Sequence, residues 1–194
     1  MPQPFLPGAE AKRLVTRQSK QEAARRELSA VAQRLQGLSK RAIFAMHRGD
    51  QTDAEKLLKE GSKLVSLGQK QLAAVPVIAQ DGAWRASREE FLEARLLASY
   101  LQETSIAFLN QEDPEIAIGA LSDLVGELVR QAVMEAVKGN KEAVEKMLSV
   151  GQQVVATLLE MDLIGGLRSK VDQAKSHLRR LEDIRYDLAM RSAL

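Results

Sequence analysis

The chain has 194 residues with 28 Lys+Arg and 26 Asp+Glu, so its net charge is only +2. It is 45% hydrophobic and 4% aromatic and contains no cysteine, which excludes disulfides, thiolate metal sites and cysteine nucleophiles. Strong helix formers such as Ala, Leu, Glu, Lys, Arg and Gln are abundant, and the length suits one buried core. We therefore expect a single all-α domain over residues 1–194.

The N-terminus carries no recognisable targeting signal. The opening residues MPQPFLPGAE contain no basic segment followed by an apolar run, and no stretch reaches the roughly 18 uninterrupted apolar residues of a membrane span. We expect a cytoplasmic protein with no membrane partner, in which residues 1–8 form a disordered tail.

The apolar periodicity predicts a long first helix over residues 9–47. Its apolar stripe comprises Leu14, Leu28, Val31, Leu35, Leu38 and Phe44. Gly49 can take the left-handed conformation that ends this helix. Asp50 or Asp53 can then cap a second helix that reaches about residue 74.

Residues 75–84, which contain Pro76 and Gly82, form the one obvious loop. Periodicity and turn residues then predict four more helices. The first two cover residues 86–109 and 114–138, the third runs from the KGNKEA turn to about residue 162, and the last covers residues 167–189. Gly61 and Gly151 stand inside helices, where each costs about 1 kcal/mol relative to Ala, so we expect neighbouring helices to approach closely there. About six to seven helices with short connections favour an antiparallel bundle or αα-superhelix.

Charge is unevenly distributed along the chain. Residues 11–48 hold ten Lys+Arg against Glu22 and Glu27, and the remaining residues carry 18 basic and 24 acidic side chains. A basic first helix on an acidic body indicates an anionic partner, with nucleic acid as the leading candidate. A solvated helix face explains the charge alone equally well.

Two carboxylates of the third predicted helix lie on its apolar side. At 100° per residue, Glu90 and Glu93 are about 60° apart. The other side chains on this face are apolar: Leu97, Leu101 and Phe108. Arg88 and Arg95 cluster on the opposite side, and Glu89 falls away from the centre of the apolar face.

The segment GALSDLVGELVRQAV of the fourth predicted helix behaves in the same way. Asp123 and Glu127 lie about 40° apart on the helical wheel, together with small and apolar side chains and with Arg130. The two acids therefore share the helix face that is expected to be buried.

Two inward-facing acid pairs on consecutive antiparallel helices can converge on one spot. Buried, ionised carboxylates are costly and repel one another unless they are neutralised. A divalent cation would neutralise them, and an all-oxygen ligand set favours Mg²⁺ or Mn²⁺. Pairing of Asp123 or Glu127 with Arg130 or with an arginine of the first helix is the alternative, and periodicity alone favours it. A di-iron site is set aside because no Glu-x-x-His motif is present.

Other catalytic chemistry has little support in the sequence. His47 and His177 are isolated, and we expect partly exposed helix residues rather than an acid–base pair. The sequence contains no GxxxxGK[ST] loop, no GxGxxG after a strand and no GxSxG elbow. We expect Trp84 to pack into the core rather than to stack on a base.

Four segments carry a family resemblance: LSKRAIFAMHRGD, EFLEA, GALSDLVGELVR and LRSKVDQAKSHLRRLEDIRYDLAMR. With these segments in this order, over residues 22–192, the chain resembles the translin family. Within that family it is more similar to the translin-associated factor X branch, with its archaeal and bacterial relatives, than to translin itself. It departs from the pattern at Val129, where a second arginine often stands.

The resemblance implies an αα-superhelix that assembles into a closed, roughly octameric shell around RNA, alone or with a translin-like second subunit. It also implies a Mg²⁺- or Mn²⁺-dependent endoribonuclease acting on single-stranded RNA or on RNA with single-stranded parts, with single-stranded DNA as a further ligand. Carried over by motif, Glu90, Glu93 and Asp123 are the catalytic metal ligands. Glu127 is a fourth ligand or their neighbour.

Arginines of the first, third and fourth predicted helices are expected to contact the nucleic-acid backbone: Arg41, Arg48, Arg88, Arg95 and Arg130. The main alternative is a non-catalytic RNA-binding shell of translin type. A helical scaffold with no nucleic-acid role is the third hypothesis.

Overall fold

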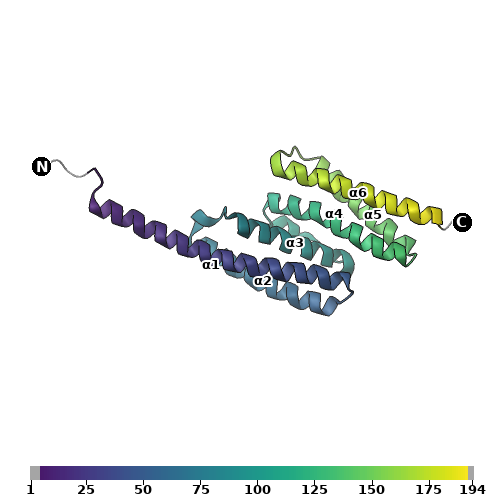
Figure 1. Cartoon of the computed structure of the whole chain (residues 1–194), viewed down its shortest axis with the longest axis horizontal. Helices are drawn as coiled ribbons and strands as arrows, with labels where there is room; N and C mark the ends of the chain where they lie inside the picture. Colours follow the sequence, from purple (N-terminus) through teal and green to yellow (C-terminus); the bar gives the residue numbers. More distant parts are fainter. Residues whose placement is uncertain (1–4, 192–194) are drawn as a thin grey trace.

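The computed structural model describes residues 5–191, which form six α-helices and two short 3₁₀ helices (Figure 1). The elements are α1 (Gly8–His47), α2 (Gln51–Ala74), η1 (Pro76–Ile78), α3 (Gly82–Gln102), η2 (Ala107–Gln111), α4 (Pro114–Val137), α5 (Lys141–Leu159) and α6 (Gly165–Arg191). This confirms the predicted all-α architecture. None of the described helices is both long and apolar enough to cross a membrane.

The turns after α1 and α4 use the predicted chemistry. Gly49 and Gly139 have φ angles of 78° and 75°, a left-handed conformation that glycine adopts without a steric penalty. The next residue in each turn caps the following helix: the Asp50 side chain accepts from the Asp53 N–H at 3.0 Å, and Asn140 does the same at the start of α5. Both hairpins therefore close in the same way.

α3 ends seven residues earlier than predicted, at Gln102. Glu103 adopts a left-handed conformation with φ 54°, and the N–H of Thr104 donates to the Ser99 carbonyl at 2.9 Å, which closes the helix. Phe108 therefore lies in η2, outside the helix, and its predicted place on the α3 face is wrong. The reason is that apolar periodicity continues past Gln102 while the backbone does not.

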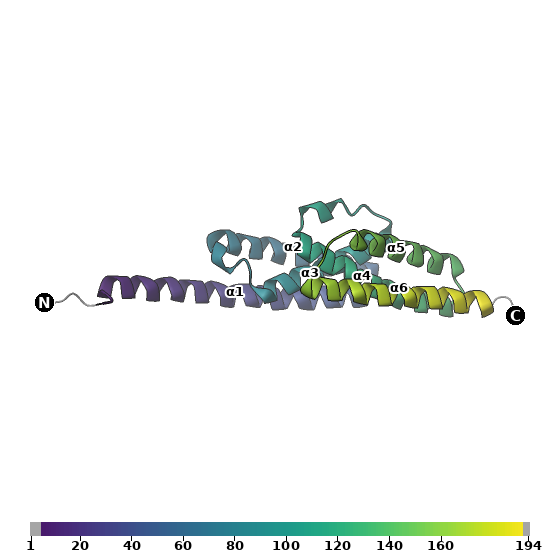
Figure 2. The same ribbon diagram turned by 90° about the horizontal axis from the view of Figure 1, so that it is seen from above.

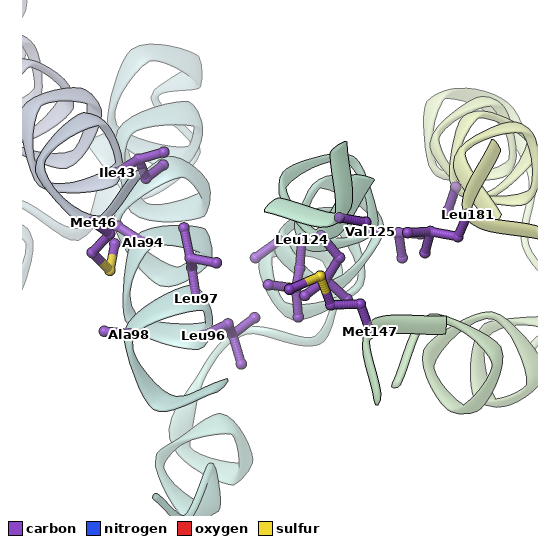
Figure 3. Packing of buried hydrophobic residues seen from close by; sticks show 14 of the residues in the cluster. Ile43, Met46, Ala94, Leu96, Leu97, Ala98, Leu124, Val125, Met147 and Leu181 are labelled. Carbon is purple, nitrogen blue, oxygen red and sulfur yellow. The ribbon is translucent and has the colours of Figure 1, made fainter. Parts of the chain in front are cut away.

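The helices pack in chain order. α1 lies against α2 and α3, α3 also packs on α4, and α4 lies against α5 and α6 (Figure 1). Between the two halves, Leu96 and Leu97 of α3 face Leu124 of α4 (Figure 3). On the other side of α4, Val125 lies toward Leu181 of α6. The contact between α3 and α4 thus joins the α1–α3 half to the α4–α6 half through buried apolar side chains.

The glycines inside helices allow close packing, as predicted. A Cβ on Gly61 would overlap the ring of Phe91, and a Cβ on Gly151 would lie 3.0 Å from Leu181 Cδ1. Trp84 lies directly against Gly68 and is buried, which confirms its expected place in the core. In α2 and α5 these glycines therefore let large side chains from neighbouring helices approach the backbone.

The N-terminal half of α1 extends beyond the rest of the molecule (Figures 1 and 2). For this reason Leu14, predicted to belong to the apolar stripe, is 56% exposed, whereas the stripe from Leu28 to Leu38 is buried. Phe44 is 51% exposed, with the Arg48 guanidinium 4.7 Å above its ring. Residues 1–4 of the predicted tail lie outside the described residues, and helix already begins at Gly8.

Candidate metal site and nucleic-acid surface

The predicted carboxylates come together where α3 packs on α4. They come from two helices that run in the same direction, so the predicted antiparallel packing of this pair is wrong: Arg85 near the start of α3 pairs with Glu115 at the start of α4, and the segment around η2 carries the chain back between them (Figure 2). α1 and α6 border the carboxylates on either side. The acidic site comprises Glu89, Glu90 and Glu93 of α3 with Asp123 and Glu127 of α4. The two predicted pairs therefore meet, and Glu89 joins them.

Glu93 is the innermost acid of the site. It is 9% exposed and forms no hydrogen bond or ion pair with any residue between 5 and 191. Burial raises its pKa to about 8, and the nearby charges of Asp123, Glu127 and Glu90 act in the same direction. Burial, reinforced by the negative charge of the neighbouring acids, therefore favours the neutral form of Glu93 at pH 7.

Lys170 of α6 neutralises one side of the acidic site. Its Nζ donates to Asp123 Oδ2 at 2.6 Å and lies 2.7 Å from Glu89 Oε1. Burial would lower the pKa of Lys170, but its bonds to Asp123 and Glu89 outweigh that effect and raise the pKa. Burial raises the pKa of Glu89, although Lys170 opposes the shift.

Gly119 of α4 makes room for the Glu89 carboxylate. A Cβ on Gly119 would overlap the carboxylate of Glu89, so the absence of a side chain lets that group lie against the α4 backbone. One turn later in α4, Asp123 shares Lys170 with it. The glycine that opens the GALSDL segment therefore shapes the acidic site.

α1 supplies partners on the other side of the acidic site. Nε2 of His47 faces a carboxylate oxygen of Glu127 within hydrogen-bonding distance, and Nδ1 of His47 has no partner within the described part of the chain. The His47 side chain is buried, so the expectation of partial exposure is wrong for it. Glu90 accepts a hydrogen bond from Gln36 at 3.3 Å and lies 3.9 Å from Lys40 Nζ.

This arrangement matches the ion-pair interpretation in kind, with different partners. Asp123 pairs with Lys170 and Glu127 with His47, rather than either acid with Arg130 or an α1 arginine. Among residues 5–191, no three acidic or histidine side chains are arranged to hold a metal ion. The acids themselves nevertheless suit Mg²⁺ or Mn²⁺, because carboxylate oxygens are the ligands these ions prefer and negative charge is in excess around Glu93.

The five predicted nucleic-acid-binding arginines divide into two groups. Arg88 is 7% exposed and pairs with Glu112, and Arg95 lies 3.6 Å from Glu112 and 3.8 Å above the Phe108 ring. The Arg88 guanidinium is thus engaged inside the protein, and the half-buried Arg95 is held by Glu112 and Phe108; their role at an RNA backbone stays a prediction. The exposed group consists of Arg41, Arg48 and Arg130.

Arg41 and Arg48 directly follow Lys40 and His47, the α1 residues that contact the acidic site. Their positions place exposed positive charge on the helix that borders the carboxylates. Arg130 follows Glu127 by about one turn of α4. These exposed cations therefore belong to α4 and to the C-terminal end of α1, the elements that carry Asp123, Glu127 and the partners of the acidic site.

Sequence reasoning missed three members of the site. Glu89 precedes Glu93 by four residues, a spacing that brings two side chains to the same helix face and could have identified it. Lys170 stands four residues before the buried Ala174, which places it beside the core face of α6. Nothing in the periodicity of α1 distinguishes His47 as a partner of Glu127.

Comparisons with known proteins agree with this fold. The family model of the translin family matches residues 23–192. The crystal structure of AfC3PO is 23% identical with a TM-score of 0.84, over 95% of this chain and 99% of that one. The structure of AfC3PO in complex with duplex RNA is 23% identical with a TM-score of 0.82, over 93% of this chain and 97% of that one. The crystal structure of apo-NeC3PO is 24% identical with a TM-score of 0.83, over 96% of this chain and 100% of that one. No curated protein matches the chain.

Proposed function

The chain belongs to the translin family, and from this membership and its acidic site we propose that it is a divalent-metal-dependent endoribonuclease. The observation that carries the proposal is the crowding of carboxylates around the buried Glu93. A helical scaffold has no need for such a cluster, because burying several acids together is unfavourable. Functional sites are where such strongly shifted pKa values concentrate.

Glu90, Glu93, Asp123 and Glu127 would hold Mg²⁺ or Mn²⁺. A divalent ion bound there supplies Lewis-acid chemistry, neutralising charge on a phosphate and making a nearby water more acidic. The protein's own contribution is to hold the carboxylates in place before metal binds: His47 contacts Glu127 from α1, and Lys170 contacts Asp123 from α6. Because α3 and α4 are joined by a packed core, these carboxylates are held on rigid elements (Figure 3).

RNA would reach the site along the exposed cations beside it. Arg41, Arg48 and Arg130 are exposed and can contact phosphates, and Phe44 is an exposed ring in the last turn of α1, below the Arg48 guanidinium. The complex of AfC3PO with duplex RNA supports nucleic-acid binding by this fold. For this chain we propose RNA with single-stranded regions as substrate, and single-stranded DNA as a ligand that is bound through the same phosphate contacts.

A closed homo-oligomeric shell, with an octamer favoured, is part of the proposal. Single chains leave large apolar side chains exposed at helix ends, among them Val137 at the end of α4 and Ile164 before α6. Exposed apolar groups of this kind are typical of surfaces that become buried on assembly. A translin-like second subunit is the alternative partner for the same surfaces.

The competing function is a non-catalytic RNA-binding oligomer, and one observation favours it. Lys170 and His47 already occupy Asp123 and Glu127, so the acids are compatible with a purely structural ion-pair network. Binding would then be strongly salt-dependent and independent of divalent metal.

A cleavage assay separates these possibilities. Purified protein is incubated with fluorescent single-stranded, hairpin and duplex RNAs in EDTA, Mg²⁺ or Mn²⁺, and RNA affinity is measured at two salt concentrations. The proposal expects internal cleavage of the RNAs with single-stranded regions, in divalent metal alone. Binding without cleavage in any metal would support the non-catalytic oligomer, and absence of RNA affinity at low salt would indicate a scaffold.

A further inference from the structure

Lys170 connects three helices at the edge of the acidic site. It belongs to α6, and its ammonium lies between Asp123 of α4, at 2.6 Å, and Glu89 of α3, at 2.7 Å. Both distances are short for an ammonium–carboxylate pair, and such charge-assisted hydrogen bonds are among the stronger ones in proteins. The Lys170 side chain is 30% exposed, so its charge is partly withdrawn from water.

A second lysine of α6 shows what an ordinary pairing looks like. Lys175 lies 3.3 Å from Asp172 of its own helix and forms no ion pair with another helix within residues 5–191. Lys170, by contrast, pairs with two carboxylates from other helices, because Gly119 leaves space for the Glu89 carboxylate beside Asp123. The position of Lys170 is therefore determined by three elements, whereas that of Lys175 depends on one.

Glu89 and Asp123 differ in what they offer a metal. Asp123 belongs to the proposed ligand set together with Glu93, whereas Glu89 lies outside that set. An ammonium and a divalent ion that both contact the carboxylate of Asp123 would be only a few ångströms apart, and at that distance they repel each other strongly. When Asp123 binds a metal ion, the ammonium of Lys170 can still pair with the carboxylate of Glu89.

We propose that Lys170 is the internal counter-cation of the acidic site, and that divalent metal must displace its ammonium from Asp123 towards Glu89. This inference rests on the proposed function, since it takes Asp123 as a metal ligand. Lys170 then has two effects: it stabilises the metal-free protein, and it weakens the affinity of the site for divalent cations. Lys170 is thus a positioning residue that sets the metal concentration at which the site fills.

The direction of one effect distinguishes this role from a merely structural one. If Lys170 only held the helices together, removing it would loosen the ligands and weaken metal binding. If it is the counter-cation, removing its charge raises the affinity, because one competing positive charge leaves the immediate surroundings of the site. We expect at least about tenfold tighter binding of Mn²⁺.

The test uses the full chain and Mn²⁺ itself as the probe. Mn²⁺ binding is titrated at pH 7 by electron paramagnetic resonance, and thermal unfolding is recorded in EDTA and in Mn²⁺, for the parent, Lys170→Met, Lys170→Gln and Lys170→Arg. Lys175→Met is the matched control, since it removes the same charge from the same helix. We expect both neutral variants to bind Mn²⁺ more tightly and to unfold at a lower temperature in EDTA, with Mn²⁺ recovering the difference. Lys170→Arg and Lys175→Met should behave like the parent.

Mn²⁺ affinity equal to or weaker than that of the parent in both neutral variants would overturn the inference. Asp123→Asn, titrated beside them, keeps that outcome separate from failure of the proposed function. If Asp123→Asn loses Mn²⁺ binding and Lys170→Met gains none, only the role of Lys170 is wrong. If neither the parent nor Lys170→Met binds Mn²⁺, or if Asp123→Asn binds it as well as the parent does, the metal site itself is wrong, and both proposals fall.

Discussion

Replacing Glu93 by glutamine should stabilise the metal-free protein, and by an amount that grows with pH. Glu93 is buried among other acids, and burial raises its pKa from 4.5 to about 8. Glutamine has nearly the same shape and cannot ionise, so it removes the cost of a buried negative charge while it preserves the packing. The change therefore measures the combined cost of burying the Glu93 charge and of placing it among other acids.

The sign and size follow from proton linkage. The unfolded carboxyl loses its proton near pH 4.5 and the folded one near pH 8, so between these values the folded state binds more protons. Folding stability of the parent therefore falls as pH rises through this window and levels off above it. At about 1.4 kcal/mol per pKa unit, the shift corresponds to about 5 kcal/mol above pH 8. For a chain of this size each kcal/mol moves Tm by about 2 to 4 °C, so we expect a gain on the order of 10 °C.

The assay is thermal unfolding of the parent and Glu93→Gln in EDTA at several pH values from 4.5 to 9. The gain in Tm should be small at pH 4.5 and largest at pH 8 to 9. Glu182→Gln, an exposed position on α6, is the matched control and should show no pH-dependent gain. With Mn²⁺ present the order should change, because the parent can use an ionised Glu93 as a ligand and the variant cannot.

A Tm difference between Glu93→Gln and the parent that is the same at pH 4.5 and pH 9 would refute the reasoning. That result would mean that Glu93 is as well solvated in the folded protein as in the unfolded chain. The acidic site would then lack the charge crowding that supports the metal proposal.

Two further predictions test the packing and the arginine assignments. Gly61→Ala should lower stability by about 1 to 3 kcal/mol because its methyl group would overlap an aromatic ring. Gly37→Ala, at an exposed helix position with open space around it, should instead raise stability by up to about 1 kcal/mol. Chemical denaturation of both variants checks this, and equal effects on the free energy of unfolding would contradict it. Arg88→Ala should lower stability by up to about 3 kcal/mol with RNA affinity unchanged, because the buried Glu112 loses one of its two arginine partners and keeps only the more distant Arg95. Arg48→Ala should weaken RNA binding and its salt dependence with Tm unchanged, and the reverse pattern in the two measurements would refute the division of the arginines.

Much of the fold could be predicted because local signals and tertiary packing agree. Gly49 with Asp50 ends one helix and starts the next, and the glycine at position 139 with its following asparagine repeats this, so the turn residues define the boundaries. The end of α3 could not be predicted in this way. Glu103 takes a left-handed conformation that is unfavourable for a non-glycine residue, and an apolar pattern continues beyond it.

The candidate site was predictable on the helices where apolar periodicity marks the buried side. Glu93 and Asp123 share faces with core residues, and the structure places them in one acidic site. Their partners could not be predicted, because Lys170 comes from a helix that is distant in sequence and whose packing no local pattern determines. The sequence places Arg88 opposite the apolar face and predicts that it contacts nucleic acid, but Glu112 approaches it there and both side chains are buried.

The most direct test of the central claim is RNA cleavage by Asp123→Asn, measured in Mn²⁺ on the same preparation as RNA affinity and oligomeric mass. Asp172→Asn, an exposed acid on α6, is the control. The account predicts that Asp123→Asn cleaves at least about 10³-fold more slowly than the parent, while it binds RNA and assembles as the parent does, because a metal ligand acts on the transition state. Cleavage by Asp123→Asn at the parent's rate would contradict it.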